Sequence, residues 1–415
     1  MSAERDAARD LFARYRRMTA AQQHLLASRL EQQGRSLNIP SSASLARGGG
    51  APAQRPGFSL FFFSDRSRPL GRHYELVLKC AEEADEAGLE AIWIPERHFH
   101  DFGGPYPNPA LLAAAIAMRT RRIGIRAGSV VMPLHNPIRV VEDWSVVDSL
   151  SGGRCGIAVA SGWHPADFAL LSNVPYDARR EETFALLDHV SRMWRSRLPE
   201  RSADCSHDRD HDGLTILPTP VQPILPMWLT TTGRRETWMQ AARRGVGVLT
   251  GLLEQTRSQL AQNIAVYREE LARHHTPEAG KVTVMLHCLL KADAEDARAA
   301  ARAAMTRYFE NHLQMYLPFI RKLHAGIDID SLTAQDRSAL VAKGADRYIA
   351  GDALVGSAQT AVQSCAELRE AGVDEVACLV DFGPVDGDVL ETVSQLRILA
   401  KSSLAMPEPT SSVAG

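Results

Sequence analysis

The chain has 415 residues, of which 45% are hydrophobic and 23% charged, and its formal net charge is −2. Such a composition is typical of a globular protein, and so small a net charge argues against a nucleic-acid partner. The N-terminus is charged and no apolar run approaches the roughly 18 residues that a membrane span needs, so we expect neither secretion nor a membrane partner.

The first 55 residues differ from the rest of the chain. Thr19 begins a capping-box pattern, and leucines follow it at helical spacing among several arginines. Residues 40–52 are rich in Ser, Ala, Gly and Pro, as flexible linkers are. We therefore predict three parts, which are an N-terminal helical segment with a linker (1–55), one domain (56–403) and a disordered tail (404–415).

Apolar strands alternate with helices from residue 56 onward. The predicted strands lie at residues 58–63, 91–94, 123–132, 156–160, 227–230, 246–249, 282–290 and 375–380. Helices are expected between them, for example at 71–88, at 108–120 with Pro109 in the first turn, and at 136–150. Gly88, Gly245 and Gly372 each stand where a helix would end and turn directly into a strand.

Eight short βα units favour a closed (β/α)₈ TIM barrel, because a 400-residue parallel α/β chain commonly folds around one core. An open doubly wound sheet is the competing architecture. Two stretches exceed the bare barrel: residues 195–226, expected as a surface excursion with a small hairpin at 214–217, and residues 292–351, expected as a helical insertion between strands seven and eight.

In a barrel of this kind the active site lies at the carboxyl ends of the strands. After the second strand, residues 95–104 hold a dense set of ionisable and aromatic groups that includes Arg97 and His98. A solvated loop is an equally good interpretation. A metal site from His98, His100 and Asp101 is less favoured because all three stand on one loop, and we predict no metal.

The loops after the third, fourth and fifth strands are the other candidates. Gly128, Ser129, Ser161 and Gly162 are small enough for a ligand to approach the backbone, and Trp163 could pack on a planar ring. Simple tight turns would explain these residues equally well. The strongest anion signal is the segment after the fifth strand, where hydroxyls, a glycine and two cations enter a helix. It comprises Thr231, Thr232, Gly233, Arg234, Arg235, Glu236 and Thr237. Capping of this helix by Thr232 is the alternative interpretation. Fingerprints for dinucleotides and for ATP are missing from the sequence.

Several of these motifs together resemble the bacterial luciferase-like flavin monooxygenases, in type and in order. They are Ile94-Pro95-Glu96-Arg97-His98-Phe99, Ala127 to Pro133 with His135-Asn136-Pro137, Glu142-Asp143, and Val159 to Trp163. The resemblance covers about residues 56–400 and is strongest to the branch associated with natural-product assembly lines. It implies a barrel that binds FMN without a covalent bond, takes the flavin in reduced form from a separate reductase, and oxidises its substrate through a peroxyflavin.

The resemblance also assigns residues. Gly128 and Ser129 match a bulge under the isoalloxazine, where a non-proline cis peptide is common; Ser161 and Gly162 match residues that line the flavin, and the segment from Thr231 to Thr237 matches the phosphate side. Arg97 stands where the luciferases have a catalytic histidine. Arginine cannot accept a proton, so His98 takes the expected acid/base role and Arg97 is left to bind an anion or carbonyl.

The leading hypothesis is a cytoplasmic FMN-dependent monooxygenase that hydroxylates, or inserts oxygen into, an intermediate of natural-product biosynthesis. Six scattered cysteines suit a reducing cytoplasm. The alternatives are a deazaflavin-dependent oxidoreductase on the same barrel and a flavin-binding protein without catalysis. We expect a homodimer whose substrate is a small molecule or is tethered to a carrier protein, for which the N-terminal helix would be a docking segment; packing of that helix on its own barrel is the alternative.

Overall fold

The computed structural model describes residues 56–63, 72–99, 102–197, 214–252, 255–276, 279–311 and 333–401. Eight of its strands form a closed parallel barrel, because β1 pairs with both β2 and β9, and β7 pairs with both β6 and β9. The closure confirms the predicted (β/α)₈ barrel and excludes the open doubly wound sheet. The barrel strands are β1 (Gly57–Phe61), β2 (Ala91–Ile94), β3 (Gly124–Val131), β4 (Cys155–Ala160), β5 (Met227–Thr230), β6 (Gly247–Gly251), β7 (Val282–Leu290) and β9 (Glu375–Leu379).

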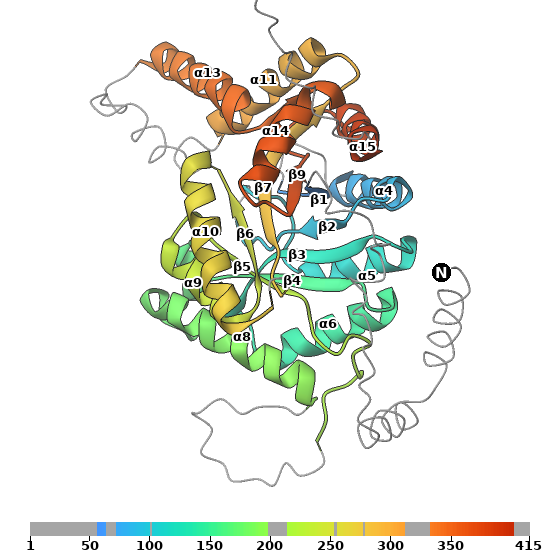
Figure 1. Ribbon diagram of the computed structural model, residues 1–415, viewed down its shortest axis with the longest axis vertical. Helices are drawn as coiled ribbons and strands as arrows, with labels where there is room; N and C mark the ends of the chain where they lie inside the picture. The colour runs from blue at the N-terminus through green and yellow to red at the C-terminus, as the bar shows by residue number, and fades with distance from the viewer. Residues whose placement is uncertain are drawn as a thin grey trace, which may run out of the picture. The chain divides into compact units, whose positions relative to one another are not determined.

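Helices surround the strands (Figure 1). Between the helices and the outer faces of the strands lies the larger of the two apolar cores. Asn108 and Asn136 cap α5 and α6, and each is followed by a proline in the first helical turn. The surrounding helices are α4 (Arg72–Ala87), α5 (Pro109–Arg119), α6 (Pro137–Ser151), α7 (Pro165–Leu171), α8 (Arg179–Ser196), α9 (Arg235–Arg244), α10 (Arg257–His274), α14 (Ala358–Glu370) and α15 (Asp386–Lys401).

The helical insertion precedes the last barrel strand, as predicted. Its described parts are α11 (Ala294–Asn311) and α13 (Ala334–Gly351), which lie at the top of Figure 1. One strand was not predicted: β8 (Leu354–Gly356) is short and pairs in parallel with the end of β7. Three residues are too few for the apolar pattern of a strand to stand out against the helices on either side.

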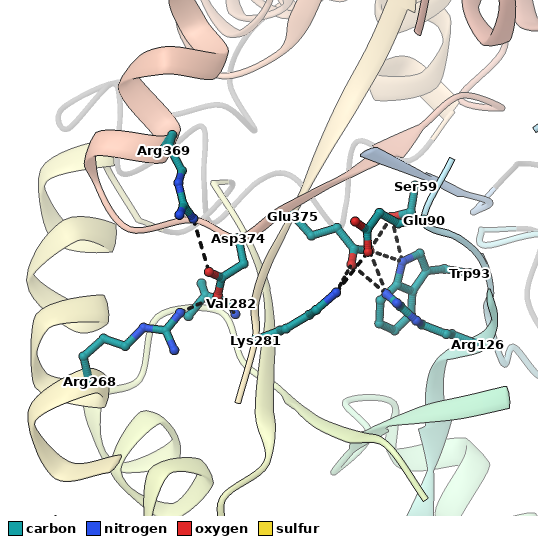
Figure 2. Close-up of polar contacts among 10 residues, drawn as sticks. All are labelled: Ser59, Glu90, Trp93, Arg126, Arg268, Lys281, Val282, Arg369, Asp374 and Glu375. Atoms are coloured by element: carbon teal, nitrogen blue, oxygen red, sulfur yellow. Dashed lines mark hydrogen bonds and ion pairs between the residues drawn. The ribbon is translucent and has the colours of Figure 1, made fainter. Parts of the chain in front are cut away.

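The inner face of the barrel carries a buried charge near the amino ends of the strands (Figure 2). The Glu375 carboxylate accepts hydrogen bonds from Arg126 at 2.8 Å, Ser59 at 2.6 Å and the Trp93 indole at 3.2 Å. The Arg126 guanidinium in turn lies over the rings of Trp93 and Trp228, 4.8 and 4.7 Å from their centres. We call this set of residues the barrel floor. It lies at the end where parallel barrels keep structural rather than catalytic residues.

One predicted element is wrong. Residues 214–226 contain no strand, so the hairpin expected at 214–217 is not formed; Ile216 instead bonds the Arg197 carbonyl through its backbone N–H, at 2.8 Å. The N-terminal segment and the tail predicted over 404–415 lie outside the described residues. Within the described ranges, no helix is long and apolar enough to cross a membrane.

Candidate active site

The loop after β2 places a buried carboxylate between two histidines. Glu96 has a fully buried side chain, and its Oε1 lies 2.8 Å from Nε2 of His98 and 2.7 Å from Nε2 of His135. The other carboxylate oxygen accepts the Val131 N–H at 3.0 Å, which ties the loop to the end of β3. Sequence reasoning quoted Glu96 and His135 within motifs but did not pair them, because 39 residues separate them along the chain.

Burial and hydrogen bonding act in opposite directions on these groups. Burial opposes ionisation of Glu96, but bonds from His135, His98 and the Val131 N–H outweigh it and hold the pKa of Glu96 below its ordinary value. Burial likewise disfavours protonated His135, but Glu96 and, more weakly, Asp143 raise the pKa of His135 above its ordinary value. Glu96 is therefore an anion at neutral pH that favours a proton on the neighbouring imidazole.

Arg97 points away from this pair and is also buried. Its Nε donates to the Phe102 carbonyl at 2.8 Å, its Nη1 lies 3.4 Å from the Asp167 carboxylate, and its guanidinium carbon lies 4.5 Å from the centre of the Trp163 ring. Burial lowers the pKa of Arg97, and the Asp167 carboxylate opposes that shift. Buried Nη2 of Arg97 finds no hydrogen-bond partner among the described residues and can still bond a ligand, whereas Oδ1 of Asp167 lies 3.6 Å from Nδ1 of His164.

The residues expected beneath the flavin lie on β3 and reach the end of β5. The Gly128–Ser129 peptide is cis, and the pairing of β3 with β4 slips between Ala127 and Val130. The Ser129 hydroxyl bonds the Thr230 hydroxyl at 2.6 Å. A Cβ on Gly128 would lie 2.7 Å from the Phe61 ring, so packing inside the barrel already requires glycine there.

The loop after β4 connects to the start of α8. Ser161 and Gly162 are half-buried and Trp163 is 46% exposed. The Gly162 carbonyl accepts a bond from Arg179 Nε at 3.3 Å. Gly162 has a φ of 75°, and a Cβ there would lie 2.8 Å from Val131 Cγ1 and 2.9 Å from the Phe168 ring. Its backbone conformation and its neighbours therefore both demand glycine.

The segment after β5 differs from expectation in where the helix begins. The first residue of α9 is Arg235, its N-cap is Arg234, and Arg234 makes no side-chain cap bond. Thr232 is exposed and is not the cap, so that alternative is wrong. Gly233 has a φ of 112°, which few residues other than glycine adopt, and its carbonyl accepts a bond from Asn263 at 3.2 Å. The backbone N–H of Gly233 donates to the buried Thr231 hydroxyl at 3.4 Å.

Two arginines that sequence reasoning missed join this region. Arg179 and Arg180 begin α8, and the pKa of Arg180 is lowered by burial and by the nearby charges of Arg234 and Arg179. We call Arg179, Arg180 and Arg234 the arginine cluster. Like charges are brought together at a cost, which a bound anion relieves.

The remaining predicted residues of this segment are exposed or make only local hydrogen bonds. Arg235 and Glu236 are exposed, and Glu236 accepts a bond from Gln240 at 2.8 Å. The Thr237 N–H donates to the Arg234 carbonyl at 3.0 Å. The described residues hold no group of three His, Cys, Asp or Glu side chains that could bind a metal, and His100 and Asp101 lie outside them.

The site thus combines a buried carboxylate bonded to two histidines, a buried cation with an unsatisfied donor, and an arginine cluster at two helix starts. Residues 56–375 match the family described as luciferase-like monooxygenase. The chain belongs to this family. It is therefore a flavin-dependent monooxygenase, as the order of the motifs indicated.

Relatives of this luciferase-like monooxygenase include proteins named as monooxygenases. The oxygenase component of the flavin-dependent trigonelline monooxygenase of Acinetobacter baylyi is 21% identical over 343 residues, covering 79% of this chain and 89% of that protein. The 4-hydroxyprotoasukamycin monooxygenase of Streptomyces nodosus subsp. asukaensis is 37% identical over 129 residues, covering 30% of this chain and 34% of that protein.

Solved structures show the same fold. The oxygenating constituent of 3,6-diketocamphane monooxygenase from Pseudomonas putida, in complex with FMN, has a TM-score of 0.66 at 17% identity, covering 84% of this chain and 97% of that one. An F420-dependent secondary alcohol dehydrogenase also matches, with a TM-score of 0.58 at 16% identity, covering 83% of this chain and 99% of that one. The fold alone therefore does not choose between flavin cofactors.

Proposed function

We propose that the chain is the FMN-dependent oxygenase of a two-component system and receives reduced FMN from a separate flavin reductase. The observation that carries this proposal is the arginine cluster at the N-terminal ends of α8 and α9. Cations and free N–H groups at a helix start bind phosphate, with which FMN ends. A relative described as an oxygenase component supports the reductase, and a structural neighbour in complex with FMN supports the flavin.

The residues of the site fit FMN. The arginine cluster would hold the phosphate together with the segment from Thr231 to Thr237, in which Thr232, Arg234, Arg235 and Glu236 are exposed. Gly128, Ser129, Ser161 and Gly162 would line the ring system, with Trp163 at its edge. The unsatisfied Nη2 of Arg97 suits a carbonyl or carboxylate oxygen of the flavin or of the substrate.

Reduced FMN, when bound, would supply the electrons that activate oxygen. The chain would supply charge stabilisation and proton transfer. Arg97 stays cationic in its buried position and stabilises negative charge on the reacting atoms. His98 is held through Nε2 by Glu96, while no described residue bonds its Nδ1. His98 therefore exchanges a proton with the reacting groups through Nδ1, as a general acid or base.

We further propose that the substrate is an intermediate of natural-product biosynthesis. The enzyme would hydroxylate it, or insert an oxygen atom into it, in the cytoplasm. The partial match to 4-hydroxyprotoasukamycin monooxygenase supports this substrate class. No disulfide links the five described cysteines, which suits a reducing compartment. Carrier tethering, docking by the N-terminal helix and a homodimer stay predictions of the sequence.

Comparison of FMN with riboflavin tests the phosphate seat. Riboflavin lacks the phosphate, so Arg180→Ala and Arg234→Ala should weaken FMN binding by about 1–3 kcal/mol, or about 5- to 150-fold, and leave riboflavin affinity unchanged. Arg195→Ala, at the far end of the same helix as Arg180, is the matched control. Equal losses for both flavins, or no loss for FMN, would place the phosphate elsewhere.

The alternatives are separated by cofactor and by oxygen. A deazaflavin enzyme would bind F420 in preference to FMN and would transfer hydride without consuming oxygen. A binding protein without catalysis would take up FMN but would not couple substrate oxidation to oxygen uptake. Titration with both flavins, followed by oxygen uptake with reduced FMN and a candidate substrate, tells the three apart.

A further inference from the structure

The guanidinium of Arg97 has one nitrogen left for a ligand. Its Nε donates to the Phe102 carbonyl at 2.8 Å and its Nη1 lies 3.4 Å from Oδ2 of Asp167, whereas buried Nη2 has no hydrogen-bond partner among the described residues. A bidentate carboxylate needs Nη2 together with either Nε or Nη1. Each of those two nitrogens already faces an oxygen atom of the protein. The geometry therefore suits a ligand that offers a single acceptor atom.

The charge of Arg97 is already balanced by Asp167. The two side chains are only 4% and 7% exposed, and Oδ1 of Asp167 lies 3.6 Å from Nδ1 of His164. A ligand carboxylate on Nη2 would bring a second anion toward the buried Asp167 carboxylate, and the repulsion between them grows as water is excluded. A neutral carbonyl oxygen accepts the same hydrogen bond without that repulsion.

Aromatic side chains lie around this ion pair. The centre of the Trp163 ring lies 4.5 Å from the guanidinium carbon of Arg97, and Trp163 is 46% exposed. The Phe102 ring packs edge-on against the Phe63 ring, with 5.0 Å between their centres. A Cβ on Gly103 would lie 2.9 Å from Arg97 Cδ and 3.0 Å from the Phe63 ring. A ligand that bonds Nη2 therefore meets aromatic surface, which favours an apolar skeleton beside its acceptor atom.

We propose that the pair of Arg97 and Asp167 determines substrate specificity: it accepts a neutral carbonyl oxygen, such as that of a ketone, ester or amide, and rejects a carboxylate. The inference rests on the proposed function, because the pair selects a substrate only if this is the substrate site. Arg97 contacts the substrate through Nη2, whereas Asp167 acts through Arg97 and is a positioning residue. The carbonyl oxygens of a flavin have the same chemistry, so the experiment must separate the two sources.

The experiment measures the binding of two probes of similar shape, acetophenone and benzoate, to the full chain with and without FMN. Acetophenone carries a neutral carbonyl group and benzoate a carboxylate on the same phenyl ring. The indole N–H signal of Trp163 in NMR titrations reports binding, because its ring packs on the guanidinium. The variants are Asp167→Asn and a double variant with Arg97→Met and Asp167→Asn, in which neither member of the pair is charged. The affinity of the same proteins for FMN is measured in parallel.

Asp188→Asn is the matched control. Asp188 also pairs with an arginine, since its Oδ1 lies 2.9 Å from Nε of Arg244. The guanidinium carbon of Arg244 likewise lies over an aromatic ring, 5.3 Å from the centre of Phe184. This control removes the same kind of charge from the same kind of ion pair, outside the proposed site.

Wild-type protein should bind acetophenone about ten-fold or more tightly than benzoate. Asp167→Asn leaves the charge of Arg97 unbalanced, so the affinity for benzoate relative to acetophenone should rise about ten-fold or more, whereas Asp188→Asn should leave this ratio unchanged. The double variant should lose that gain and bind acetophenone about ten-fold more weakly than wild type, with its FMN affinity unchanged.

The specificity is overturned if wild-type protein binds neither probe or prefers benzoate, or if Asp167→Asn leaves the ratio unchanged. It is also overturned if the double variant binds acetophenone as wild type does and loses affinity for FMN, because Nη2 would then serve the flavin. If Asp167→Asn does not fold, the double variant decides alone by its affinity for acetophenone. Wild-type protein that fails to bind FMN contradicts the proposed function, while the probe ratio in flavin-free protein still decides the specificity of the pair.

Discussion

A histidine buried among aromatic rings gives a stability that depends on pH. His287 lies on β7, with the rings of Tyr308, Tyr348 and Phe382 centred 5.2 to 5.6 Å from its own. Nδ1 bonds the Tyr348 hydroxyl at 2.8 Å, and buried Nε2 has no hydrogen-bond partner among the described residues. Burial lowers the pKa of His287 to about 3. The folded protein therefore keeps this imidazole neutral where the unfolded chain protonates it.

The sign and size of the effect follow from proton linkage. An unfolded histidine titrates near pH 6.5, so the unfolded state binds more protons than the folded state between about pH 6.5 and pH 3. The free energy of unfolding therefore falls as the pH falls through this window, with a limiting slope of about 1.4 kcal/mol per pH unit. From about pH 8 to about pH 5, His287 alone should remove about 2 kcal/mol.

Replacement of His287 by Asn removes the titrating ring and keeps a polar group near Tyr348. Urea unfolding of flavin-free wild-type and variant protein, measured from about pH 8 to about pH 5, should show that the variant loses about 2 kcal/mol less over that range. His274→Asn is the control for loss of an exposed imidazole. Parallel stability profiles for wild type and His287→Asn would refute the reasoning, whatever the absolute cost of the substitution.

Two further substitutions test the packing of the barrel. Gly128→Ala should destabilise the fold by about 1–3 kcal/mol, because the new methyl group would lie 2.7 Å from the Phe61 ring. Gly344→Ala is the control, since no atom lies within 4 Å of the new carbon there. Thermal melting should show that Gly344→Ala raises the free energy of unfolding by up to about 1 kcal/mol. Glu375→Gln should cost about 3–5 kcal/mol in the free energy of unfolding, since it leaves Arg126 buried without its anion. Glu90→Gln removes a 42% exposed partner of Lys281 and should cost about 1 kcal/mol or less; equal costs for the two Glu variants would contradict the structural role of the barrel floor.

The barrel could be predicted because its signals are local. Apolar runs such as 91–94 and 156–160 fix the strands, and Asn108 and Asn136 mark helix starts through their own side chains. Gly88, Gly245 and Gly372 all adopt positive φ at the predicted turns. The predicted hairpin at 214–217 does not form. The surrounding stretch is polar and rich in proline, and an isolated two-stranded hairpin without a further strand beside it is only marginally stable.

The site was only partly predictable, because its decisive contacts join residues far apart in the sequence. His98 and Arg97 are neighbours along the chain, yet one bonds Glu96 and the other bonds Asp167, 70 residues away. The charge of Arg234 acts on Arg180, 54 residues earlier in the sequence, because α8 and α9 begin near the same end of the barrel. A charge-rich helix start such as Arg179-Arg180 has no distinct pattern of its own, since paired arginines are common on exposed helices.

Both ends of the barrel bury an ion pair, and the difference between them indicates where a ligand binds. At the amino end, the Glu375 carboxylate accepts bonds from Ser59, Trp93 and Arg126. At the carboxyl end, Arg97 and Asp167 are also buried, but Nη2 of Arg97 has no bond among the described residues, and Oδ1 of Asp167 has only an ion pair with Nδ1 of His164 at 3.6 Å. A buried polar atom left unpaired costs about 1–3 kcal/mol, and Nη2 of Arg97 is such an atom on a charged group at the end of the barrel where ligands bind. A ligand that accepts a bond from Nη2 of Arg97 would recover that energy; in the proposed function it would be recovered where negative charge develops on the reacting atoms.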